Sequence, residues 1–100
     1  MQVVTDSISF SPFRGSGPRS TFKDVTFGAN VSQATVFLSG FTASFSHGND
    51  HHLGNLNVQL TSSILSPNSV RVTATFGLRD WSGSWDDDYD GQVFFTVVGD

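Results

Sequence analysis

The residues best suited to ligand chemistry lie in one acidic, aromatic stretch, residues 80–91. It holds both tryptophans, the only tyrosine and five of the nine acidic residues. Trp81, Trp85 and Tyr89 recur every four residues, and their large flat rings are suited to stacking on a ligand. We therefore expect these three rings to form a binding surface. In the alternative interpretation, Trp81 and Trp85 cover the open end of the core.

The acidic residues of this stretch have the spacing of a calcium-binding loop. Asp86, Asp88 and Asp90 alternate along the chain, and Gly91 permits the sharp turn behind them. An EF-hand is excluded, because its twelfth position would be Val97 rather than a glutamate and would fall inside an expected strand. The pattern predicts calcium bound by Asp86, Asp88 and Asp90 in a loop between strands. A solvated acidic turn is the alternative.

All three histidines lie in a second polar segment, residues 47–52. Adjacent histidines on an extended backbone point to opposite sides, so the three imidazoles are poorly placed to bind one zinc ion. We expect Asp50, His51 and His52 instead to hydrogen-bond a polar ligand or the acidic loop. A solvated turn without a ligand is the alternative.

Composition and charge narrow the classes of function. The chain has 100 residues, the size of one domain, and no cysteine, so it is not a disulfide scaffold. Its net charge is −4 and its five basic residues are scattered, which argues against nucleic-acid binding. No apolar run reaches the length of a membrane span and no signal peptide is visible, so we expect no membrane partner. The compartment stays open, and an extracellular role is compatible with these features.

Apolar and polar residues alternate along short runs that are separated by turn residues. Glutamate is absent, while phenylalanine, valine and threonine are abundant. This pattern predicts an all-β fold, an antiparallel β-sandwich of about six to eight strands, with a closed barrel as the alternative. Residues 1–100 should form one domain, in which residues 1–20 are either an arm or an edge segment. The expected strands are residues 3–10, 21–27, 32–45 with a bulge or break at Gly40, 56–61, 70–78 and 93–98.

The inward-facing positions of these runs predict the core. The expected core residues are Val36, Leu38, Val58, Leu60, Val72, Ala74, Phe76, Val93 and Phe95. The last run differs from the others, because Phe94 and Val98 make its second face apolar as well. Either a partner subunit or the N-terminal segment must cover these two side chains. We therefore expect a homo-oligomer, a dimer or a trimer.

The order of the runs resembles that of H-type lectin domains. The segment from Val25 to Phe41, VTFGANVSQATVFLSGF, is similar to the V-x-F strand and the following V-x-L-S-type strand of that family. The later runs NLNVQL and VRVTATFGL and the terminal strand fit the same succession of six antiparallel strands. The chain has Phe94-Phe95 where the family carries a tryptophan, and Asn57 and Gln59 where it often has an arginine. The resemblance implies a sugar-binding β-sandwich with a His, Trp and Asp site in the loops at one end, without assigning individual sugar contacts.

Catalysis has little support in the sequence, which contains no cysteine and no G-x-S-x-G motif. We therefore expect a binding module rather than an enzyme, with a glycan as its ligand. Aromatic rings of the acidic stretch would supply affinity, and polar groups of both loops would supply hydrogen bonds, directly or through calcium. The alternative function is that of a structural protein that assembles into an oligomer, fibre or particle coat.

Overall fold

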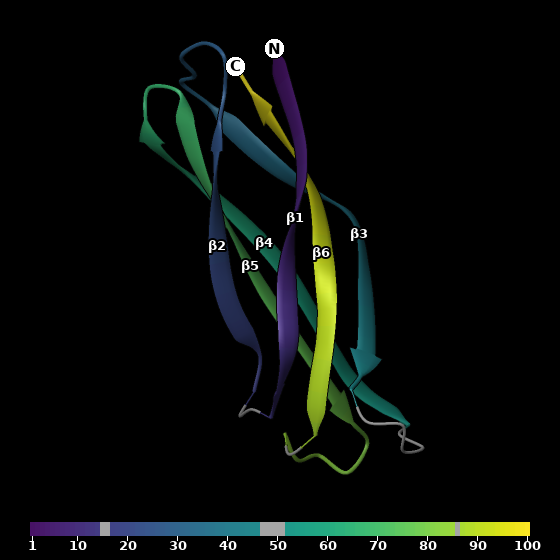
Figure 1. Cartoon of the computed structure of the whole chain (residues 1–100). Helices are drawn as coiled ribbons and strands as arrows, with labels where there is room; N and C mark the ends of the chain where they lie inside the picture. The colour runs from purple at the N-terminus through teal and green to yellow at the C-terminus, as the bar shows by residue number, and fades with distance from the viewer. Residues whose placement is uncertain (15–16, 47–51, 86) are drawn as a thin grey trace.

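A computed structural model describes residues 1–14, 17–46, 52–85 and 87–100. These residues form six β-strands and no helix (Figure 1). The strands are β1 (Gln2–Arg14), β2 (Arg19–Thr26), β3 (Ala34–Phe45), β4 (Leu53–Ser66), β5 (Ser69–Asp80) and β6 (Asp88–Gly99). The described part of the chain contains no helix of the length and apolarity that a membrane crossing requires.

The strands form two antiparallel sheets of three, which confirms the predicted fold class. β6 is the central strand of one sheet, in the order β1-β6-β3, and β5 is the central strand of the other, in the order β2-β5-β4. We call them the β6 sheet and the β5 sheet. Together they form an elongated sandwich that measures 48 × 19 × 17 Å. β1 lies near β2 at one edge of the sandwich, and β3 lies near β4 at the other (Figure 1).

The core lies between the two central strands. Because successive side chains of a strand point to opposite faces, β5 buries every second residue from Val70 to Leu78. β6 buries Tyr89, Val93, Phe95 and Val97 in the same way, with the half-buried Gly91 between the first two. The predicted core residues that have no exposed surface are Val72, Ala74, Phe76, Val93 and Phe95. Three further predicted core residues are half-buried on the outer strands and pack against these buried side chains. They are Val36, Val58 and Leu60.

β3 contains a bulge next to Gly40, where the sequence predicted one. Leu38 and Gly40 pair with consecutive residues of β6, which leaves Ser39 as the extra residue. The inward face therefore changes from even to odd positions and continues from Phe41 to Phe45. The prediction that Leu38 belongs to the buried core is wrong, since 49% of this residue is exposed. Leu38 faces inward, but it lies on an edge strand. Within its sheet it therefore has a neighbouring strand, β6, on one side only.

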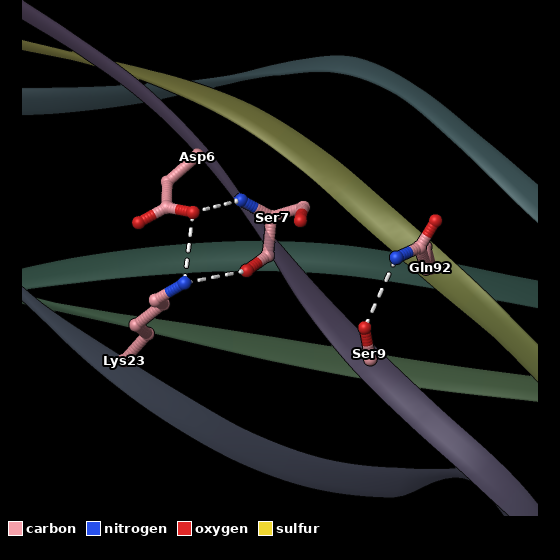
Figure 2. A network of polar contacts seen from close by, with 5 residues as sticks. All are labelled: Asp6, Ser7, Ser9, Lys23 and Gln92. Carbon is pink, nitrogen blue, oxygen red and sulfur yellow. Dashed lines mark hydrogen bonds and ion pairs between the residues drawn. The ribbon is translucent and has the colours of Figure 1, made fainter.

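The edge between β1 and β2 carries a pair of charged side chains (Figure 2). Asp6 pairs with Phe95 and Lys23 pairs with Val72, both core residues, so the two charged groups point between the sheets. Lys23 Nζ donates to Asp6 Oδ1 at 2.8 Å and to the Ser7 carbonyl oxygen at 3.3 Å. The hydrogen bond from Lys23, with one from the Ser7 N–H, holds the pKa of Asp6 below its ordinary value of 3.8. This edge of the sandwich is therefore polar.

The outer face of the β6 sheet mixes apolar and polar groups. Phe94 is exposed, as the sequence led us to expect, whereas Val98 is half-buried. Beside them, Gln92 Nε2 donates to Ser9 Oγ at 3.1 Å and links β6 to β1 (Figure 2). The apolar side chains that led us to expect an oligomer thus lie on a surface that also carries polar groups.

Candidate functional site

Three connections lie at the end of the sandwich opposite to the chain termini (Figure 1). They follow β1, β3 and β5. β1 and β3 run in the same direction because both pair antiparallel with β6, and β5 ends at the same end of the sandwich (Figure 1). The termini mark the other end, where the Met1 amino group lies 3.5 Å from the Asp100 carboxylate. We call the end with the three connections the loop end. The described parts of both segments that the sequence singles out, His52 and the residues around Trp81, lie there.

The first half of the β5–β6 connection is ordered by its own hydrogen bonds. Asp80 Oδ1 accepts from the Ser82 N–H at 3.0 Å and from the Ser82 hydroxyl, which is the geometry of an Asx turn. Arg79 donates to the Gly83 carbonyl oxygen at 3.3 Å. Gly83 has a φ of +86°, a conformation that glycine adopts without the steric strain of a side chain. These contacts fix the backbone on both sides of Trp81.

Trp81 is an exposed ring of the loop end, with 75% of the residue accessible to solvent. Its backbone N–H donates to the His52 carbonyl oxygen at 3.0 Å, which joins the β5–β6 connection to the start of β4. The His52 imidazole meets the indole edge to face, with ring centroids 6.2 Å apart. The structure thus brings together two of the predicted site residues from distant parts of the sequence.

Trp85 has a different environment from Trp81. Its ring is half-buried and packs against the core, 6.3 Å from the ring of Tyr89. The Arg79 guanidinium lies 5.6 Å from the indole centroid, within the range of a cation–π contact. A Cβ placed on Gly77 would lie 3.0 Å from the Trp85 ring, so the indole sits directly over this glycine. Trp85 therefore covers the end of the core, which was the alternative interpretation of this residue.

Tyr89 is fully buried, which corrects the expectation that its ring faces a ligand. β6 begins at Asp88, and the odd-numbered positions of this strand face the core, so Tyr89 points inward. Its hydroxyl donates to the Gly17 carbonyl oxygen at 2.9 Å and lies 3.4 Å from that of Phe76. Tyr89 thus ties the connection after β1 to the two central strands.

The acidic residues of the predicted calcium loop are only partly described. Asp88 and Asp90 lie two residues apart on β6, and Asp90 Oδ1 accepts from Ser44 Oγ at 3.1 Å and from Ser46 Oγ at 3.0 Å. Among residues 1–14, 17–46, 52–85 and 87–100, no group of three or more His, Cys, Asp or Glu side chains could hold a metal ion. Asp86, the third predicted ligand, lies outside the described residues, as do Asp50 and His51 of the histidine segment.

Arg19 is a residue of the loop end that the sequence analysis missed. Its guanidinium lies 4.6 Å from the centroid of the Tyr89 ring and 5.7 Å from that of Phe10. It also donates to the Tyr89 carbonyl oxygen at 3.0 Å and to that of Ser11 at 2.9 Å. Residues 15–20 are rich in glycine, serine and proline, a composition that predicts a loop. This composition gives no sign that β2 begins at Arg19.

Comparisons with models of protein families, with curated proteins and with solved structures gave no match for this chain. The function is therefore argued from the geometry of the loop end.

Proposed function

We propose that the protein is a non-catalytic module that binds a glycan at the loop end, with Trp81 as its stacking surface. One observation carries this proposal: Trp81 is 75% exposed on a backbone that hydrogen bonds hold in place. A ring so exposed contributes little to the core, whereas Trp85 and Tyr89 of the same stretch pack against it. Binding residues are commonly carried by loops on a rigid scaffold, and exposed tryptophans are frequent anchors of binding.

The groups around Trp81 suit a polyhydroxylated ligand. A sugar presents an apolar face of C–H groups, which can stack on an indole, and a rim of hydroxyls, which need hydrogen-bond partners. His52, Asp80 and Ser82 lie beside Trp81 and can supply donors and acceptors for such a rim. The resemblance of the strand order to H-type lectins favours the same class of ligand.

Replacing Trp81 by alanine should reduce glycan affinity about 30-fold, because truncating an anchoring aromatic typically costs about 2 kcal/mol of binding free energy. A glycan array of the wild type would first identify the sugar, and calorimetric titration with that sugar would then compare the variants. Phe37→Ala is the matched control, since Phe37 is an exposed aromatic residue on β3 that lies outside the loop end. A wild type that binds no glycan, or equal losses in both variants, would contradict the proposal.

Calcium binding by Asp86, Asp88 and Asp90 is a separate prediction. An ion that binds the folded chain alone raises its stability by mass action, by about 1 kcal/mol when free calcium is about four times its Kd. We expect the wild type to melt a few degrees higher in calcium than in chelator, and Asp88→Ala to melt at the same temperature in both. Coincident wild-type curves would identify the stretch as an acidic turn. The glycan titration repeated in chelator would show whether the sugar depends on the ion.

The alternative function is that of a structural protein that assembles into a fibre or a particle coat. It requires contact surfaces between copies of the chain rather than a ligand site. A fibre grows by open-ended assembly, which joins two different patches of each copy, whereas a particle coat closes at a fixed size. Particles that grow without limit as protein concentration increases, or large particles of one fixed size, would favour this function over a binding module. Sedimentation velocity over a range of concentrations distinguishes the two.

A further inference from the structure

The edge of the sandwich between β3 and β4 exposes apolar side chains that face inward. Four residues of these strands pair with inward-facing residues of β6 or β5 and so point between the sheets. They are Leu38, Phe41, Leu56 and Ile64. Between 38% and 49% of each is nevertheless exposed. Inward-facing apolar side chains are thus accessible to solvent along this edge, next to the buried core.

A groove of about 450 Å³ lies in this edge. Its lining is Phe41, Ala43, Ser44, Phe45, Leu53, Leu56 and Leu78. Apolar side chains from β3, β4 and β5 meet in it, so a partner that filled it would remove apolar surface from water. Removal of apolar surface from water is the main driving force of protein association.

The two edges of the sandwich differ in charge. β3 has 12 residues and β4 has 14, and neither strand contains a charged residue. At the opposite edge, Asp6 and Lys23 point inward and form an ion pair. Inward-pointing charges and lysines on edge strands are the usual protection against edge-to-edge association. The chain protects one edge in this way and leaves the other unprotected.

We propose that the edge formed by β3 and β4 binds the same edge of a second copy of this chain. An uncharged surface offers no counter-charge to an acidic or basic partner, whereas it can face itself without repulsion. The contact is isologous, with each copy presenting the same residues about a two-fold axis. None of the charged residues lies on β3 or β4, so the contact places no like charges of these strands against each other.

The size of the edge fits this occupant. A strand of 12 residues is about 40 Å long at about 3.3 Å per residue. The two shorter extents of the sandwich are 19 and 17 Å, so such an edge offers roughly 700 Å². A standard interface buries about 800 Å² on each partner. The edge is therefore large enough for a specific dimer, and the inference stands whether or not the loop end binds a glycan.

Sedimentation velocity from about 1 to 500 µM tests the proposal. We expect the wild type to form a particle of twice the chain mass, and Leu38→Lys and Leu56→Lys each to raise the dissociation constant at least 100-fold. Val3→Lys is the matched control, because Val3 is 54% exposed on β1 at the other edge, and this variant should associate as the wild type does. Circular dichroism of each variant checks that it folds. The concentration series of the wild type tests dimer formation even if a variant does not fold.

Two results would overturn the proposal. One is a wild type that stays monomeric at 500 µM. If that monomer co-sediments with phosphatidylcholine vesicles and Leu38→Lys does not, the edge binds lipid instead. The other is a dimer that Val3→Lys disrupts while folded Leu38→Lys and Leu56→Lys leave it intact, which would place the contact elsewhere.

Discussion

Tyr89→Ala should lower the free energy of unfolding by about 3–5 kcal/mol, the usual cost of truncating a buried aromatic residue. Tyr89 has no exposed surface, and its ring packs 5.6 Å from that of Phe76 at the centre of the core. The substitution would also remove the surface on which Arg19 and Trp85 rest. Because a domain of this size has a total stability of about 5–15 kcal/mol, the loss would be a large part of it. Urea denaturation followed by circular dichroism would measure it.

Tyr89→Phe is the control that separates the ring from the hydroxyl. It keeps the packing and removes the hydrogen bond to the Gly17 carbonyl oxygen, so we expect a loss of about 1 kcal/mol. The same small loss in Tyr89→Ala would mean that Tyr89 lies in a surface loop, as the sequence first indicated. A larger loss in Tyr89→Phe than in Tyr89→Ala would contradict the packing described here.

Strand identity was predictable wherever one face of a strand is buried. The run from Val70 to Leu78 alternates without interruption, and the structure buries each of its inward positions. Gly40 marked the bulge correctly, because a glycine inside an alternating run indicates a local change of register. Alternation predicts the face of a side chain but not its depth, which depends on the neighbouring strands. It therefore placed Leu38 in the core, although no strand covers it at the open edge.

Strand ends and the candidate site were harder to predict. Acidic residues are rare in strands, so the sequence pattern assigned residues 80–91 to a loop and missed that β6 begins at Asp88. β1 similarly continues past Pro12 to Arg14, because an edge strand tolerates a proline and the register shifts between Phe10 and Phe13. The chemistry of Trp81 was visible in the sequence. The sequence also raised a contact of His52 with the acidic stretch, but not the specific backbone and ring contacts with Trp81, which depend on how β4 and β5 pair.

Gly91→Ala should lower the free energy of unfolding by about 3 kcal/mol, the upper part of the range for overpacking a core. Gly91 occupies an inward position of β6, between the buried residues Tyr89 and Val93. A Cβ at this position would lie 2.7 Å from the Phe76 ring and would overlap the Thr42 carbonyl oxygen. Phe76 is fully buried in the core, and the Thr42 oxygen belongs to the backbone of β3, so a shift of the first disturbs the core and a shift of the second disturbs the β6 sheet.

Gly40→Ala is the matched control, because it makes the same substitution in the same sheet. A Cβ on Gly40 would meet nothing within 4 Å, and the φ of this residue lies outside the left-handed region. We therefore expect its stability to stay within about 0.5 kcal/mol of the wild type. Urea midpoints of the two variants, compared under one set of conditions, measure the difference directly. Equal midpoints would show that the core at Gly91 has room for a methyl group, and the packing of β3 and Phe76 against β6 would need to be revised.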